Sequence, residues 1–239
     1  MSDGVDVRTL VVIPAFNEEE ALPAVLAQLR EVTPDLDIVV VDDGSSDGTA
    51  AVTRAAGLPC LQLPFNLGIG GALRAGYRYA ADNGYDRAVQ FDADGQHRAD
   101  QIAVLLAELD AGADMAVGSR FLAGGYRVGR GRGMAMGLLR LGVRLLTGQK
   151  FSDTSSGFRA TRQPLLDVFA RDYPVEYMDS VETLVGACRA GFSVSEVPTL
   201  MEERAGGVPS QRPLHLAYHY ARLLVALVGT PRRAVPTGG

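Results

Sequence analysis

The chain is poor in cysteine and has no long apolar segment. Its 239 residues include two cysteines, Cys60 and Cys188. A disulfide framework is therefore not expected, and both thiols are interpreted as small buried hydrophobic groups of a protein from a reducing compartment. No stretch reaches the roughly 18 apolar residues that a membrane-spanning helix needs. The acidic N-terminal residues predict no secretory signal.

Several signatures of common site types are also missing. The net charge of -5 gives no general attraction to nucleic acid, so nucleic acid is not expected as a partner. There is no G-K-[ST] sequence, which excludes a P-loop enzyme. The loop at Gly68 and Gly70 lacks the third glycine of the dinucleotide fingerprint. A calcium-type loop that begins at Asp43 has Arg54 where an EF-hand needs glutamate.

Apolar strand patterns alternate with helical patterns along most of the chain. Leu22, Val25, Leu26 and Leu29, for example, follow a short apolar run at the spacing of one helix face. Such alternation predicts an α/β fold with a mainly parallel central sheet flanked by helices. Strands are expected at 10–13 and 38–41 and within 60–84, 87–97, 114–121 and 193–204. Helices are expected within 99–112, 134–148 and 181–191. A turn-rich polar segment is expected at 151–162.

Two carboxylates follow the fourth predicted strand one residue apart. On an extended backbone Asp92 and Asp94 point to the same side, and Gln96 offers a third oxygen. Oxygen ligands of this kind suit Mg²⁺ or Mn²⁺, which often keep water or phosphate in their coordination shell. The alternative is a solvated acidic loop. His97, next to the carboxylates, is interpreted either as their supporting partner or as incidental.

Arginines gather in the polar loops of the second half of the chain. An arginine fork matches phosphate oxygens, whereas any single one of these residues could be only a solvated side chain. A cation on one side and arginines on the other would suit a reaction between two phosphate-bearing molecules. The residues concerned are Arg120, Arg127, Arg130, Arg132, Arg159 and Arg204.

Seven short motifs occur in a fixed order: VVIPAFNEEEAL, VVVDDGSSDGT, NLGIGGAL, FDADGQH, VGSRF, DTSSGFRATR and EVPTLMEERAGGVPS. This order resembles family 2 glycosyltransferases with the GT-A fold. The resemblance is greatest to the branch that contains dolichol-phosphate mannosyltransferase and bacterial polyprenyl-phosphate glycosyltransferases, and it covers about residues 8 to 212. It implies a nucleotide-sugar donor, favours a UDP-sugar over a GDP-sugar, and implies Mg²⁺ or Mn²⁺ as cofactor.

The resemblance also implies roles for individual residues. Asp43 would bind the edge of the base, and Asp92, Asp94 and Gln96 would hold the metal on the donor diphosphate. Pro14, Ala15, Phe16 and Glu18 would line the nucleotide pocket, Phe16 standing where relatives often have tyrosine, and the acceptor phosphate would contact Arg120, Arg130 or Arg132, Arg204 and Ser210. Asp94, Asp153 and Arg204 are the residues expected to be catalytic.

The expected acceptor decides the expected mechanism. A polyprenyl phosphate is already anionic at neutral pH, so arginines would position it for in-line attack with inversion. An alcohol would need a general base, for which Asp153 is the candidate. The alternatives are therefore a transferase of the same fold that uses a soluble or cell-wall hydroxyl acceptor, and a non-catalytic subunit that binds nucleotide sugars.

The expected organisation is a single GT-A domain with a C-terminal apolar helix. Residues 1–7 and 232–239 are expected to be tails, about 8–121 the nucleotide-binding half, about 122–212 the acceptor half, and 213–231 an amphipathic helix. That helix could pack on the core, lie in a membrane interface or bind a small integral membrane protein. We expect a cytoplasmic protein, peripheral at the cytoplasmic face of the membrane.

Overall fold

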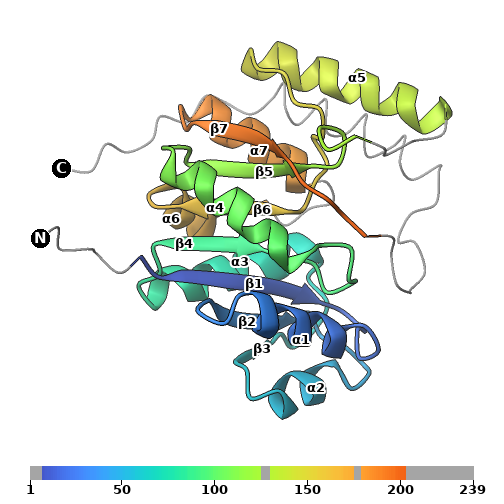
Figure 1. Cartoon of the computed structure of the whole chain (residues 1–239), viewed down its shortest axis with the longest axis vertical. Helices are drawn as coiled ribbons and strands as arrows, with labels where there is room; N and C mark the ends of the chain where they lie inside the picture. Colours follow the sequence, from blue (N-terminus) through green and yellow to red (C-terminus); the bar gives the residue numbers. More distant parts are fainter. Residues whose placement is uncertain (1–6, 125–129, 175–178, 203–239) are drawn as a thin grey trace, which may run out of the picture.

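The strands of the protein form one mixed sheet (Figure 1). The computed structural model describes residues 7–124, 130–174 and 179–202. The strands described are β1 (Thr9–Ala15), β2 (Asp37–Asp42), β3 (Cys60–Gln62), β4 (Arg87–Gln90), β5 (Met115–Ser119), β6 (Arg159–Arg162) and β7 (Val194–Pro198). Their order across the sheet is β3-β2-β1-β4-β6-β5-β7. Only β6 runs antiparallel to its two neighbours, so the prediction of a mainly parallel sheet is confirmed.

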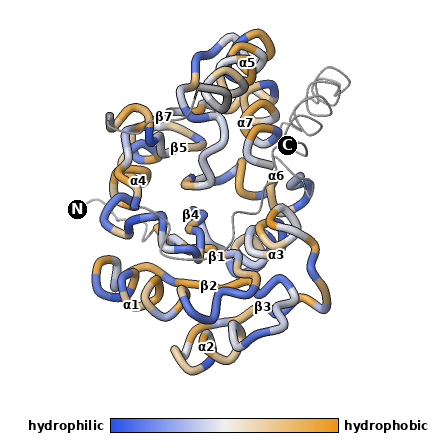
Figure 2. The backbone as a smooth tube through the Cα atoms, turned by 90° about the vertical axis from the view of Figure 1, so that its right-hand side faces the viewer, coloured by the Kyte–Doolittle hydropathy of each residue, from blue (hydrophilic) through white to orange (hydrophobic). Residues whose placement is uncertain are grey.

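Helices cover both faces of this sheet, as the alternation of strands and helices predicts. They are α1 (Leu22–Val32), α2 (Thr49–Ala55), α3 (Ile69–Asp82), α4 (Ile102–Asp110), α5 (Arg130–Thr147), α6 (Leu165–Asp172) and α7 (Asp179–Arg189). Figure 2 shows α1 and α4 on one side of the sheet and α3, α6 and α7 on the other. The helix α5 packs on α7 at the margin of the molecule.

Alternate residues of β1 enter two separate cores. Val11 and Ile13 pack with α1 and α4, whereas Leu10 and Val12 pack with α3, α6 and α7. Gly76 allows α3 to approach the strand closely, because a Cβ at this position would lie 2.2 Å from Val12 Cγ1. Burial on both faces explains why β1 reads as a continuous apolar run.

The strand β6 lies in the middle of the sheet, between β4 and β5. The prediction of a turn-rich segment at 151–162 is therefore wrong for its last four residues. Arg159–Arg162 begins and ends with arginine and has neither an apolar run nor a period of two. Its strand conformation comes from antiparallel pairing with neighbours that are distant in the sequence, which overrides the weak local preference.

No helix in the part of the chain that the structure describes is long and apolar enough to cross a membrane. The two cysteines are half-buried and form no disulfide. Burial raises the pKa of the Cys188 thiol to about 11. The predicted helix at 213–231 lies outside the described residues.

Candidate active site

The loops that follow β1 and β2 are joined by hydrogen bonds at the carboxyl edge of the sheet. The backbone N–H of Asn17 donates to Ser45 Oγ (2.9 Å), and Asn17 Oδ1 accepts from the N–H of Ser46 (2.9 Å). The N–H of Glu18 donates to Thr49 Oγ1 (2.9 Å). Asn17 has a φ of 55°, a conformation that asparagine tolerates better than most residues. The two loops therefore form one hydrogen-bonded unit beside the end of β1.

The loop that follows β3 closes on this unit. Asp43 Oδ1 accepts a hydrogen bond from the N–H of Leu67 (2.7 Å). Gly44 has a φ of +72°, and a Cβ there would lie 2.7 Å from the carbonyl carbon of Phe65. Gly44 is thus required both by its backbone conformation and by the close approach of the third loop. Ligands of open α/β sheets bind at such a carboxyl edge.

Phe16, Glu18 and Asp43, predicted to bind the nucleotide, lie in this unit, and Pro14 and Ala15 are the last residues of β1 beside it. The N–H of Asp43 donates to the carbonyl oxygen of Ala15 (2.8 Å), so the end of β1 and the acidic loop are adjacent. Pro14 and Glu18 are half-buried, whereas the Phe16 ring is exposed and could stack on a ligand. Burial of Asp43 raises its pKa, and the negative charge of nearby Asp42 raises it further. Hydrogen bonds from the backbone amides of Leu67 and Gly68 lower this pKa and partly offset the rise.

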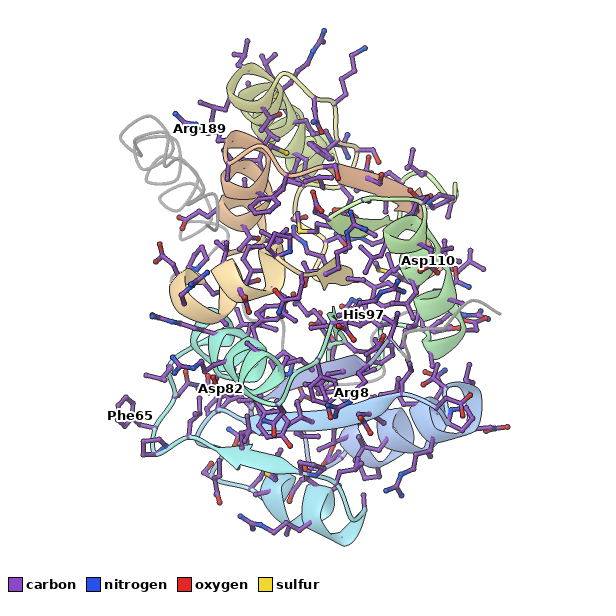
Figure 3. All side chains as sticks on the ribbon, turned by 90° about the vertical axis from the view of Figure 1, so that its left-hand side faces the viewer. Arg8, Phe65, Asp82, His97, Asp110 and Arg189 are labelled. Atoms are coloured by element: carbon purple, nitrogen blue, oxygen red, sulfur yellow. The ribbon has the colours of Figure 1, made fainter. Side chains whose placement is uncertain are left out.

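The carboxylate of Asp92 is fixed by its neighbours. Its backbone N–H donates to His97 Nδ1 (2.9 Å), and His97 Nε2 lies 3.5 Å from Asp92 Oδ2. The His97 ring is buried and stacks on Phe158, with 4.6 Å between the ring centroids. Figure 3 shows His97 near the centre of the molecule. Since Nδ1 accepts a hydrogen bond from the backbone N–H of Asp92, His97 is a supporting partner of Asp92, which decides between its two predicted roles.

Asp94 and Gln96 share a tight turn after Asp92. Asp94 Oδ1 accepts a hydrogen bond from the N–H of Gln96 (3.0 Å). Residues 7–124, 130–174 and 179–202 contain no group of three or more His, Cys, Asp or Glu side chains that could hold a metal. The donors at this turn are two carboxylates and one amide, all hard oxygen ligands. They fit Mg²⁺ or Mn²⁺ with phosphate oxygens completing the shell.

A glycine brings the polar segment before β6 against Asp92. A Cβ at Gly157 would lie 2.9 Å from Gln90 Nε2 and 3.1 Å from Asp92 Oδ2. Gln90 Nε2 also donates to Asp92 Oδ1 (3.3 Å). The acidic turn and the predicted acceptor segment are therefore in direct contact, although 65 positions separate Asp92 and Gly157.

In the same polar segment as Gly157, Asp153 forms a two-pronged ion pair with Arg120. Arg120 Nε and Nη2 donate to Asp153 Oδ2 (2.8 Å) and Oδ1 (3.0 Å), and the Asp153 side chain is fully buried. Glu196 on β7 accepts hydrogen bonds from the backbone N–H groups of Ser152 (2.7 Å) and Asp153 (2.6 Å). Arg120 is therefore positioned by Asp153, which is in turn positioned by Glu196.

The other arginines predicted to lie in polar loops do not all do so, because Arg159 begins the strand β6. Arg159 is buried and points into the core, where Nη1 donates to Thr183 Oγ1 (2.7 Å). Arg130 and Arg132 begin α5, but their side chains are outside the described part, as are Arg127, Arg204 and Ser210. The backbone N–H of Glu202, the last described residue, donates to the carbonyl oxygen of Gln96 (2.9 Å).

Two positioning residues were not predicted from the sequence. Glu196 is one acidic residue in an alternating strand, and its partners are 43 and 44 positions away. Gly157 is one of 28 glycines. The only available signal was that Gly157 belongs to the polar segment already assigned to the acceptor side.

The fold is an open α/β sheet, and the polar loops of the site gather at the carboxyl edge of its strands, where enzymes of this class bind their ligands. Residues 10–169 match the model of the family described as Glycosyl transferase family 2. The chain belongs to that family and is a glycosyltransferase with the GT-A fold.

Two curated relatives are similar over most of their length. The polyprenol monophosphomannose synthase of Mycolicibacterium smegmatis is 36% identical over 212 residues, which cover 84% of this chain and 80% of the relative. The undecaprenyl-phosphate mannosyltransferase of Micrococcus luteus is 38% identical over 210 residues, which cover 84% and 86%. The branch predicted from the motifs is thereby confirmed.

A solved structure has the same fold at lower identity. It is glucosyl-3-phosphoglycerate synthase from Mycobacterium tuberculosis in complex with Mn²⁺, uridine diphosphate and phosphoglyceric acid. The TM-score is 0.72 at 22% identity, and the match covers 98% of this chain and 81% of that chain.

Proposed function

We propose that the protein is a metal-dependent, inverting glycosyltransferase that moves a sugar from a UDP-sugar to a polyprenyl phosphate. The observation that carries the choice of acceptor is the ion pair between Arg120 and Asp153. Asp153 is the carboxylate that would serve as base for an alcohol, yet it is buried with both oxygens bonded to Arg120. An anionic acceptor needs an arginine and no base. The names of the two mannosyltransferase relatives support the same acceptor class.

The acidic turn provides for the leaving group. Asp92, Asp94 and Gln96 would hold Mg²⁺ or Mn²⁺, which when bound neutralises charge on the departing nucleoside diphosphate. His97 and Gln90 keep the Asp92 carboxylate oriented. The joined loops beside it bind the nucleotide, with Asp43 accepting from the base and Phe16 offering its exposed ring. Pro14, Ala15 and Glu18 shape the same pocket.

The acceptor phosphate is held by the second half of the chain. Arg120 binds it with one part of its guanidinium group while Asp153 fixes the rest, so Asp153 positions the arginine. Arg204, Ser210 and either Arg130 or Arg132 complete the clamp in this proposal. A phosphate oxygen held in this way attacks the anomeric carbon opposite the diphosphate, which inverts its configuration.

The relatives' names bear on the donor, and the acceptor bears on the location. Mannose in the relatives' names makes GDP-mannose the donor to test against UDP-sugars. A polyprenyl phosphate resides in a bilayer, so the protein acts as a peripheral protein at the cytoplasmic face, where nucleotide sugars are available. Residues 213–231 would contribute to that attachment, directly or through a small integral membrane protein.

The acceptor class is tested by supplying matched lipids. Purified protein with Mn²⁺ is given polyprenyl phosphate or the corresponding polyprenol, together with labelled UDP-sugars and GDP-mannose. We expect label in the lipid phase only with the phosphate, and a product of inverted anomeric configuration. Transfer to polyprenol or to a soluble alcohol would favour the hydroxyl-acceptor alternative. Donor binding without any transfer would favour the non-catalytic subunit.

A further inference from the structure

The helix α5 carries an exposed apolar stripe. Met134, Leu138, Leu141 and Leu145 are exposed by 73%, 67%, 51% and 78%. At 3.6 residues per turn, their spacing of four, three and four places them within an arc of roughly 60°. The residues that α5 buries, Met136, Leu139 and Val143, lie on the opposite side of the helix. The stripe therefore contributes nothing to the described core.

An exposed stripe of this kind requires a partner. Single exposed hydrophobic residues are ordinary, but a continuous row of four long side chains on one helix face marks an interaction surface. The helix lies at the margin of the molecule, where it packs on α7 past the edge strand β7 (Figures 1 and 2). Its outer face is therefore accessible to a large flat partner.

The charge of α5 indicates which partner fits. The helix contains four arginines and no acidic residue, although the whole chain has a net charge of -5. An apolar stripe beside basic residues is the pattern of a helix that lies in the interface of an anionic membrane. A protein partner with an apolar groove would not by itself require this concentration of one charge.

The helix is also connected to the acceptor side of the site. Arg140 of α5 lies over the ring of Phe121, 4.5 Å from its centroid. Phe121 directly follows Arg120, which is paired with Asp153. A membrane in contact with α5 would therefore lie beside the residues assigned to the lipid phosphate.

We propose that α5 docks the protein on an anionic bilayer, with Met134, Leu138, Leu141 and Leu145 inserted among the lipids. The inference rests on the proposed function, because an enzyme whose acceptor is a lipid must reach the bilayer that contains it. Docking itself requires no substrate, so it can be measured separately.

The test uses the full-length protein and vesicles of phosphatidylcholine with or without phosphatidylglycerol, free of polyprenyl phosphate. The variant Leu138→Gln/Leu145→Gln keeps good helix formers in α5 and changes exposed residues only. Val32→Gln, which changes an exposed residue of α1, is the matched control. We expect the double variant to partition at least about tenfold more weakly into anionic vesicles, and the control to bind like the wild type.

Three results would overturn docking through α5. In the first, the wild-type protein does not bind anionic vesicles. In the second, the double variant binds them as tightly as the wild type. In the third, the wild type is a dimer in solution and the double variant is a monomer. Transfer to a water-soluble short-chain polyprenyl phosphate is measured in parallel without vesicles. The double variant should retain that activity. If the wild type lacks it while vesicle binding behaves as expected, the proposed function fails and docking stands.

Discussion

His97 Nδ1 accepts the backbone N–H of Asp92 at 2.9 Å, while Nε2 of the same ring lies 3.5 Å from the Asp92 carboxylate. A single side chain therefore fixes both the main chain and the carboxylate of a residue assigned to the metal. The ring of His97 stacks on Phe158, which directly precedes β6, the strand in the middle of the sheet. The chemistry of the acidic turn thus depends on the core below it.

Removing the acceptor nitrogen of His97 should weaken metal binding. His97→Phe keeps an aromatic ring against Phe158 but leaves the Asp92 N–H without its partner, at a cost of about 1–3 kcal/mol in folding stability. We expect Mn²⁺ affinity, measured by electron paramagnetic resonance, to fall roughly 10- to 100-fold. The Mn²⁺ affinity of His97→Asn, which retains a hydrogen-bond acceptor, should lie between those of the wild type and His97→Phe. Unchanged Mn²⁺ affinity in His97→Phe would show that the ring is only structural.

A methyl group at Gly157 should disturb the same carboxylate from the other side. Gly157→Ala would place a Cβ 3.1 Å from Asp92 Oδ2 and 2.9 Å from Gln90 Nε2. We expect donor and metal affinity to fall by roughly tenfold, with a stability loss of about 1–3 kcal/mol from the forced contact. Isothermal titration with donor and Mn²⁺ measures the first effect, and thermal unfolding the second.

Gly186→Ala is the control for Gly157→Ala. Gly186 is exposed in α7 and has nothing within 4 Å of an added Cβ. This substitution should stabilise the protein by about 0.5–1 kcal/mol and leave donor binding unchanged. Equal donor affinities in both alanine variants would refute the role of the close approach at Gly157.

Loss of Glu196 should weaken binding of the acceptor lipid phosphate and leave binding of the nucleotide-sugar donor unchanged. Glu196→Ala removes the acceptor for the N–H groups of Ser152 and Asp153, and each unpaired group costs about 1–3 kcal/mol. Because Asp153 then no longer holds Arg120 in place, the KM for the lipid phosphate should rise while the Kd for the donor stays constant. Glu31→Ala, on the exposed face of α1, should change neither. A parallel loss of donor affinity would mean that Glu196 supports the fold alone.

Asp43→Asn should separate stability from nucleotide binding. Burial raises the pKa of Asp43, so the ionised carboxylate costs folding stability at every pH above its folded-state pKa. An amide oxygen can still accept from Leu67, and the variant should be as stable as the wild type at pH 7, or more so. As the pH falls through that raised pKa, the wild type becomes protonated and this cost disappears. Donor affinity should fall roughly 10- to 100-fold. Thermal unfolding across pH would contradict this account if Asp43→Asn were less stable at pH 7.

The sequence predicts the parts of the fold that rest on local patterns. β1 and β2 are apolar runs followed by helices, and the acidic turn follows directly from β4, so their place at one sheet edge could be predicted. β6 and the acceptor network could not. Glu196 reaches Ser152 across 44 positions, and Gly157 reaches Asp92 across 65, and such contacts arise only from tertiary pairing.

The central claim is that the acidic turn supports sugar transfer to a lipid phosphate. The most direct test measures transfer of labelled sugar to polyprenyl phosphate by the wild type, by Asp94→Ala and by Asp82→Ala, each with Mn²⁺ and after EDTA. Asp82 is exposed on α3, where it pairs with Arg78, and it is the matched control. We predict lipid labelling by the wild type and Asp82→Ala that EDTA abolishes, and a loss of at least about 100-fold in Asp94→Ala with unchanged folding. Wild-type rates in Asp94→Ala, or transfer that EDTA leaves intact, would contradict the account.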